Sequence, residues 1–213
     1  MARKKLIRIQ EAMGFENIIH EDMPHPKESV EDFLHGAKKS FLELGCGRGE
    51  YTVGLSEMFE NAKCIGVDIQ GERIWHGARH ALETKNKNTL FVRAHIGKIT
   101  DFIPEHSIDE IWLPFSDPFP RKKNAKKRLT SERFLKRYTK ILKPNGVVHV
   151  KTDNENLFWY SKETVEHFGA KIHELETDVP VTEDEKNPLN IQTQYEKRFR
   201  SQGKKIFHLS FSF

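Results

Sequence analysis

The chain has 213 residues, of which 37% are hydrophobic and 31% charged, and its formal net charge is +4. This length suits one α/β domain with short extensions, and the apolar fraction suffices for a packed core. No apolar run in the sequence approaches the roughly 20 residues that cross a bilayer, which excludes a membrane-spanning protein. Cys46 and Cys64 lack Cys-x-x-Cys spacing, and the basic start lacks the apolar stretch of a secretory signal. We therefore expect a reduced, cytoplasmic protein without a membrane partner.

The first 40 residues are polar, and Pro24 and Pro26 interrupt any long helix there. We expect this part, residues 1–40, to be an N-terminal extension with one or two short helices. From Phe41 onward, short apolar segments alternate with amphipathic ones. The domain that carries the function is therefore predicted over residues 41–213.

Periodicity predicts the elements of that domain. We expect strands at residues 41–44, 64–69, 89–94, 108–115, 147–151, 171–176 and 207–213. We expect helices at residues 51–59, 72–83, 131–142, 154–168 and 191–199. This alternation predicts an α/β fold with a doubly wound, mostly parallel, seven-stranded Rossmann-like sheet. The last strand has no clear crossover helix before it, so we expect it to run antiparallel near an edge.

The first strand leads into the glycine-rich turn Gly-Cys-Gly-Arg-Gly over residues 45–49, where ligands of such sheets bind. The third glycine, Gly49, comes one residue too early for the dinucleotide fingerprint, and Glu43 and Glu50 disfavour an anionic pyrophosphate. A cationic ligand fits better, and S-adenosylmethionine carries a sulfonium and an ammonium but no phosphate. Asp68 ends the second strand, where an acid accepts hydrogen bonds from ribose hydroxyls. A plain structural turn and a nicotinamide site are the alternatives.

A second set of polar residues follows the fourth strand. Asp117 lies in the segment 116–120, Ser-Asp-Pro-Phe-Pro, and six of the next eight residues, 121–128, are Lys or Arg. Removing those six charges from +4 leaves the rest of the chain at −2, so the basicity is local. Such a patch is typical of a surface that binds a polyanion, although a solvated face is the alternative. Asp153 ends the fifth strand, either as a site residue or as the N-cap of the next helix.

Several segments together resemble the tRNA (guanine-N7)-methyltransferase family, over a region from about Phe41 to the C-terminus. They are Ser116-Asp117-Pro118-Phe119-Pro120-Arg121-Lys122-Lys123, Lys126-Lys127-Arg128-Leu129, Lys151-Thr152-Asp153-Asn154 and Thr193-Gln194-Tyr195-Glu196-Lys197-Arg198-Phe199. The resemblance implies a cytoplasmic S-adenosylmethionine-dependent enzyme whose substrate is a guanine in the variable loop of tRNA. It leaves open whether the protein is a monomer or a homodimer.

The resemblance also implies roles for individual residues. The expected donor-binding residues are Glu43, Gly45, Gly47, Asp68, Ile96 and Asp117. Among them, Asp117 is expected to be catalytic, because it lies between the donor and the base. The expected substrate-binding residues are Arg121, Asp153, Thr193, Gln194, Tyr195 and Glu196. The cations expected on the RNA backbone are Lys122, Lys123, Lys126, Lys127 and Arg128.

Two positions depart from the family pattern. Phe119 stands where the family usually has Trp, which keeps an aromatic face. The segment 94–97, Ala-His-Ile-Gly, lacks the acid that faces the adenine in many members. A backbone amide at His95 or Ile96 is expected to take over that contact. The alternatives are a methyltransferase for another nucleic-acid acceptor and an RNA-binding protein with weak or lost catalysis.

Two other signals carry no functional expectation. His76 and His80 have the spacing of a zinc pair on a helix, but no third ligand lies nearby in the sequence, so we expect no metal. Cys46 lies in the glycine turn, where it is expected to be a small loop residue rather than a nucleophile.

Overall fold

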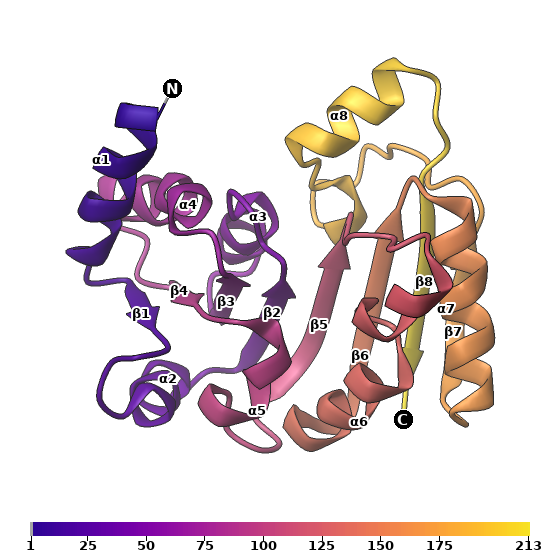
Figure 1. Ribbon diagram of the computed structural model, residues 1–213, viewed down its shortest axis with the longest axis horizontal. Coiled ribbons are helices and arrows are strands. Elements are labelled where there is room, and N and C mark those ends of the chain that lie inside the picture. Colours follow the sequence, from indigo (N-terminus) through magenta and orange to yellow (C-terminus); the bar gives the residue numbers. More distant parts are fainter. Residues whose placement is uncertain (1) are drawn as a thin grey trace.

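The computed structural model describes residues 2–213 of the chain, and within them eight strands form one sheet (Figure 1). The sheet order is β1-β4-β3-β2-β5-β6-β8-β7. The strands are β1 (Ile18–His20), β2 (Lys39–Leu44), β3 (Ala62–Asp68), β4 (Thr89–Arg93), β5 (Ile108–Pro114), β6 (Leu142–Thr152), β7 (Lys171–Glu176) and β8 (Phe207–Ser212). Neighbouring strands are parallel from β1 to β6, whereas β8 runs antiparallel to both β6 and β7.

All seven predicted strands are present, and the mostly parallel sheet with its antiparallel C-terminal strand is confirmed. The eighth strand, β1, comes from the first 40 residues and pairs with β4 at one edge of the sheet. Its three residues are all buried, so it lacks the polar alternation by which a strand is predicted. The division of the chain at residue 40 stays a prediction.

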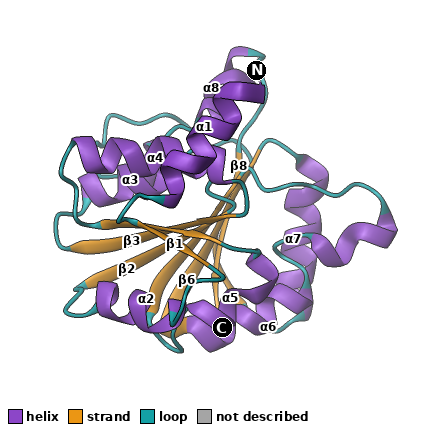
Figure 2. Ribbon diagram, turned by 60° about the vertical axis from the view of Figure 1, so that its left-hand side comes forward, coloured by secondary structure: helices purple, strands orange, loops and turns teal. Residues whose placement is uncertain are grey.

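Helices cover both faces of the sheet (Figure 2). They are α1 (Ala2–Met13), α2 (Pro26–Leu34), α3 (Glu50–Met58), α4 (Gly71–Glu83), α5 (Ile99–Phe102), α6 (Glu132–Ile141), α7 (Glu155–His167) and α8 (Gln194–Ser201). Helices α1, α3 and α4 lie on one face, and α2, α5, α6 and α7 on the other. Among the described residues, no helix combines the length and the apolar character that a membrane crossing requires.

Successive residues of the central strands enter two different cores, because side chains alternate between the faces of a sheet. Leu42 and Leu44 of β2 lie in the large core under α2, α5, α6 and α7. Phe41 packs with Tyr51 and Leu55 of α3 on the opposite face. Both cores therefore fix β2, whose carboxyl end carries the glycine turn.

Candidate active site at the carboxyl ends of the strands

The glycine turn begins directly after β2 and leads into α3. Gly45, Gly47 and Gly49 have φ angles of 75°, 54° and 74°, a region that favours glycine. A Cβ atom on Gly49 would lie 2.5 Å from the Phe91 ring, so a side chain there would push the turn away from the sheet. The turn therefore presents its backbone amides at the rim, as a site for a bound ligand requires.

Asp68 ends β3 and is held against the glycine turn. Its Oδ2 accepts a hydrogen bond from the Gly47 amide at 2.9 Å, and its Oδ1 accepts one from the Gln70 amide at 2.9 Å. Only 8% of the residue is exposed. Each carboxylate oxygen keeps a second lone pair, so Asp68 can also accept from ribose hydroxyls in its fixed position.

Glu43 lies one residue before the end of β2 and is buried. Its Oε2 accepts hydrogen bonds from the Thr52 amide at 2.8 Å and from the Thr52 hydroxyl at 2.5 Å. Burial raises the pKa of Glu43 to about 8, the neighbouring carboxylates of Glu50 and Asp68 add to the rise, and the Thr52 hydrogen bonds oppose it. Three acids thus gather around the glycine turn, and a cation placed there would lower their mutual repulsion.

The loop after β5 carries Asp117 to the same rim. Phe115 and Phe119 have positive φ angles of 52° and 40°, an uncommon conformation for residues other than glycine. The Phe115 amide donates to the Lys151 carbonyl at 2.7 Å, which ties the start of the loop to β6. The Asp117 side chain between the two bends is exposed and available to a ligand.

The basic segment follows as a short 3-10 helix, η2 (Lys122–Lys127). The five side chains Arg121, Lys122, Lys123, Lys126 and Lys127 are exposed. Arg128 differs from them, because its Nε and Nη2 donate to the carbonyls of Pro118 and Phe119 at 2.9 Å and 3.1 Å. Its guanidinium also lies 4.1 Å from the ring centre of Tyr160. The structure thus gives Arg128 an internal role in holding the Asp117 loop.

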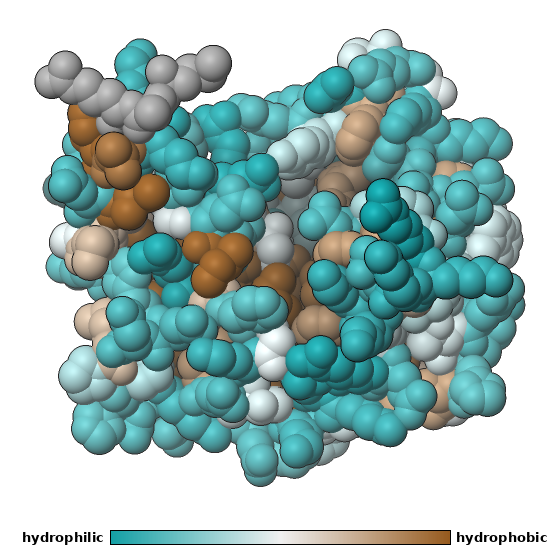
Figure 3. All heavy atoms as spheres, in the orientation of Figure 1, coloured by the Kyte–Doolittle hydropathy of each residue, from teal (hydrophilic) through white to brown (hydrophobic). Residues whose placement is uncertain are grey.

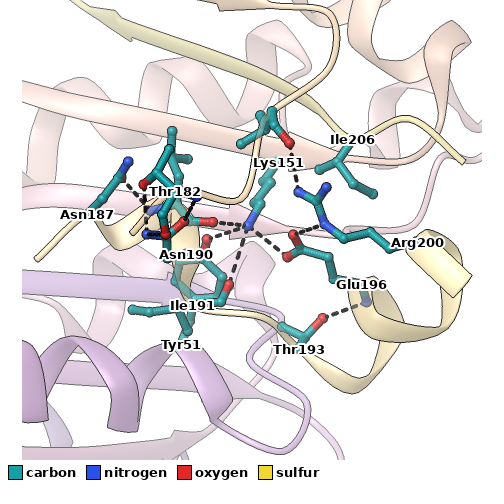
Figure 4. A network of polar contacts seen from close by, with 12 residues as sticks. Tyr51, Lys151, Thr182, Asn187, Asn190, Ile191, Thr193, Glu196, Arg200 and Ile206 are labelled. Carbon is teal, nitrogen blue, oxygen red and sulfur yellow. Dashed lines mark hydrogen bonds and ion pairs between the residues drawn. The ribbon is translucent and has the colours of Figure 1, made fainter. Parts of the chain in front are cut away.

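A buried polar network lies between β6 and α8 (Figure 4). The Nζ of Lys151, from β6, is 2.7 Å from the carboxylate of Glu196, and both side chains are fully buried. The same Nζ donates to the carbonyls of Leu189 and Ile191 and to the Tyr51 hydroxyl, at 2.6, 3.3 and 3.2 Å. Burial lowers the pKa of Lys151 to about 8, and Glu196 opposes that shift.

The other Glu196 oxygen accepts from the Arg200 Nε at 2.9 Å. Its carboxylate is therefore occupied inside the protein. Thr193 is buried, and its hydroxyl caps α8 by accepting from the Glu196 amide. Gln194 accepts from Arg48 Nη1 at 2.9 Å, and Tyr195 is 47% exposed. The segment 193–196 thus combines two residues that anchor α8 with two that face its outside.

Asp153 lies at the carboxyl end of β6, and its Oδ2 accepts from the Lys204 Nζ at 2.6 Å. The N-cap of α7 is the neighbouring residue, because the Asn154 side chain accepts from the Leu157 amide at 2.9 Å. Between the two roles that the sequence left open for Asp153, the capping role therefore belongs to Asn154. The Asp153 side chain stays 16% exposed beside Lys204.

Ile96 borders the glycine turn, since its Cδ1 would lie 4.0 Å from a Cβ atom on Gly45. The amide of His95 is not free, because it donates to the Glu21 carboxylate at 3.1 Å. Glu21 follows β1, so the region before residue 40 supplies an acid next to the segment that lacks one. The sequence analysis predicted neither the contact of Glu21 nor the internal role of Lys151. The position of Lys151 in an apolar strand was a signal that its side chain could be buried and paired.

Comparison with known proteins gives the same assignment. A family model described as a putative methyltransferase matches residues 37–209. A tRNA (guanine-N(7)-)-methyltransferase of Bacteroides fragilis is 42% identical over 180 residues, which are 84% of this chain and 71% of that protein. One of Christiangramia forsetii is 36% identical over 219 residues, 99% of this chain and 98% of that protein. This chain belongs to the tRNA (guanine-N7)-methyltransferase family.

Solved structures of other methyltransferases have the same fold as this chain. An S-adenosylmethionine-dependent methyltransferase from Aquifex aeolicus aligns with a TM-score of 0.57 at 16% identity, over 99% of this chain and 96% of that one. A 16S rRNA methyltransferase aligns with a TM-score of 0.68 at 12% identity, over 91% and 97%. At these identities the likeness shows the fold alone, and it confirms the predicted Rossmann-like methyltransferase sheet.

Proposed function

We propose that this chain transfers the methyl group of S-adenosyl-L-methionine to N7 of a guanine in the variable loop of tRNA. The observation that carries the proposal is the order β3-β2-β5-β6 in the centre of the sheet. It lines up Asp68, the glycine turn with Glu43, Asp117 and Asp153 along one rim. Figure 3 shows the molecular surface hollowed near the carboxyl ends of β2 and β5.

The residues present fit the methyl donor. Glu43 is buried with a pKa of about 8, so a cationic ligand next to it would restore the charged form of the carboxylate. Gly45 and Gly47 leave room for close approach of the ligand to the backbone. Asp68 would hold the ribose, and Ile96 would lie against the adenine. S-adenosylmethionine would supply an electrophilic methyl group on a positively charged sulfur.

The chain needs no general base for this reaction. Guanine N7 carries a free lone pair and no proton, so no side chain has to activate it. The protein's task is to hold the base in line with the methyl group at about 3 Å. Positive charge moves onto the purine during transfer, and Asp117 at the exposed tip of its loop would stabilise that charge.

Asp153 is the better candidate for guanine recognition. A carboxylate selects guanine by accepting from its N1–H and exocyclic amine. Glu196 is fully buried and bound to Lys151 and Arg200, whereas Asp153 at the rim is paired with Lys204, whose side chain is 45% exposed. We therefore assign base recognition to Asp153, and assign Thr193 and Glu196 to positioning α8.

The polymer around the base requires a cationic surface. Guanine N7 faces the deep, narrow major groove of an RNA helix, so the base must be exposed or swung out to react. Arg121 and the exposed lysines of η2 would hold the flanking phosphates. Gln194 and Tyr195 would face the base from α8. A tRNA substrate supports the expected cytoplasmic location.

The test is to incubate the protein with labelled S-adenosylmethionine and unmodified tRNA, digest the RNA and identify the product nucleoside. The expected product is 7-methylguanosine from the variable loop. A different methylated nucleoside would contradict the acceptor and favour another nucleic-acid methyltransferase. Binding of donor and tRNA without any transfer would instead favour an RNA-binding protein with lost catalysis.

A further inference from the structure

We propose that the exposed face of α6 is a second phosphate-binding surface, which continues the tRNA contact from η2 across the side of the molecule. The proposal rests on the function proposed above, because it concerns the same RNA partner. It assigns a role to residues that lie outside the Asp-Pro-Phe-Pro loop and the basic segment after it.

The two sides of α6 differ sharply. Its inward side buries Phe134, Leu135, Tyr138 and Ile141 in the large core. Its outward side exposes Arg133, Lys136 and Lys140, at the three- and four-residue spacing that stacks side chains along one face of a helix. Like charges at this spacing destabilise a helix by a few tenths of a kcal/mol per pair. A cationic face of this kind is unfavourable for the helix itself and favourable for a polyanion.

A groove of about 520 Å³ lies along this face, lined by Thr100, Glu132, Arg133, Lys136, Arg137 and Lys140. Four of these six residues are cationic and one, Glu132, is acidic. Glu132 pairs with Lys136 at 2.6 Å, which leaves the lining with a net charge of +3. The hydroxyl of Thr100 adds a neutral donor suited to a phosphate oxygen.

Arg137 gives the groove a fixed wall. Its Nε donates to the Gly97 carbonyl at 3.1 Å, and its Nη1 donates to the Arg133 carbonyl at 2.7 Å. The first bond connects α6 to the segment after β4, which borders the donor site, and the second lies within α6. The neighbouring cations Arg133 and Lys140 have no such internal bonds among the described residues and can turn toward a ligand.

The start of α6 is tied to the basic segment by hydrogen bonds. Ser131 precedes α6, its hydroxyl donates to the Lys126 carbonyl at 3.1 Å, and its amide donates to the Arg128 carbonyl at 3.0 Å. In Figure 3 the most hydrophilic side chains follow one band over η2 and down toward α6. Phosphates that leave the rim next to the methylated guanine would therefore meet the α6 cations next.

The experiment compares two triple variants by tRNA binding over a range of salt concentrations. The first is Arg133→Gln/Lys136→Gln/Lys140→Gln, which leaves Arg137 and its bonds in place. The second, Lys38→Gln/Lys85→Gln/Lys87→Gln, removes the same charge from exposed loops at the amino ends of β2 and β4. Both should keep the melting temperature and the affinity for S-adenosylhomocysteine.

We expect the α6 variant to weaken tRNA binding about tenfold or more and to lower the slope of log affinity against log salt by about 2 to 3, since each lost phosphate contact removes about 0.9. The control should change neither by more than a small amount. Equal behaviour of the two variants would overturn the α6 surface. The proposed function would then still stand, provided that the unaltered protein forms 7-methylguanosine in tRNA, and would fail separately if it does not.

Discussion

Lys151 and Glu196 form an ion pair at 2.7 Å with both side chains fully buried, and this pair connects the central strand β6 to α8. Their pairing places Gln194 and Tyr195 on the outer side of the helix.

Breaking this pair should strongly destabilise the protein. Glu196→Ala leaves the buried Lys151 charge without a counterion, and such losses typically cost about 3–5 kcal/mol. Urea unfolding measures the change in free energy. Glu166→Ala is the matched control, because it removes a helix pair with Lys162 at the same 2.7 Å but on the surface. The control should cost less than about 1 kcal/mol, and equal losses in the two variants would contradict the role of the buried pair.

Donor affinity should depend on pH through Glu43. Its pKa of about 8 means that the free protein holds a proton on this carboxyl at neutral pH, and a cationic donor favours the carboxylate. Affinity for S-adenosylmethionine should therefore rise between pH 6 and about 8 and then level off, with proton release on binding. Titration calorimetry in two buffers of different ionisation enthalpy measures the affinity and the number of protons released on binding. Glu43→Gln should bind more weakly and without proton release.

The same group makes stability depend on pH in the opposite direction. A carboxyl whose pKa rises from 4.5 to about 8 on folding is protonated in the folded state over this window. Its contribution to stability is therefore complete below pH 4.5 and is lost as the pH rises through 8. Unfolding free energies of the unaltered protein and of Glu43→Gln, measured at pH 6 and pH 9, should diverge in favour of the variant at pH 9. A constant difference would contradict the shifted pKa.

Replacing Asp117 should abolish methyl transfer without affecting folding. Its side chain is exposed at the tip of its loop, so Asp117→Ala removes the charge next to the reacting atoms and little packing. Single-turnover methylation measures the loss, and the melting temperature should stay within a degree or two. Glu105→Gln is the control. It changes an exposed acid just before β5, at the other end of the strand that precedes the Asp117 loop, and should be fully active. Near-normal turnover by Asp117→Ala would count against its catalytic assignment.

Asp153→Asn should impair substrate recognition rather than donor binding. A base contact of this kind contributes about 1–3 kcal/mol, so KM for tRNA should rise about tenfold or more while the affinity for S-adenosylhomocysteine stays constant. Lys204→Gln removes the ion-pair partner of Asp153 and leaves the carboxylate free for guanine. That variant should keep a low KM, and a rise like that of Asp153→Asn would show that the pair itself is needed.

The sequence predicted the elements whose pattern is long and regular. The strands β2 to β6 and β8 each bury several residues over a length of five or more, and the glycine turn has a strict local requirement for positive φ. Strand β7 is mostly exposed. The start of α8 was also visible, because Thr193-x-x-Glu196 is a capping signature, although the predicted helix began at residue 191. The three residues of β1 gave no such pattern.

Contacts between distant residues were beyond this reasoning. Lys151 and Glu196 are far apart in sequence, so the local pattern does not show that Glu196 is the buried counterion of Lys151. It also does not show that Glu21 accepts a hydrogen bond from the His95 amide. The basic run likewise looked uniform, yet the carbonyls of Pro118 and Phe119 set Arg128 apart from its neighbours. Which charge faces inward depends on the tertiary fold.

The position of β8 constrains how the sheet assembles. It is the last strand along the chain, but it lies between β6 and β7, and β7 has its ladder partner in β8. During synthesis, the edge of β6 that pairs with β8 therefore stays unpaired until β8 has been made, although all the preceding strands and helices are already present. An open edge of this kind can pair with other chains, so the nascent protein passes through a stage at which chaperones that shield strand edges should matter most.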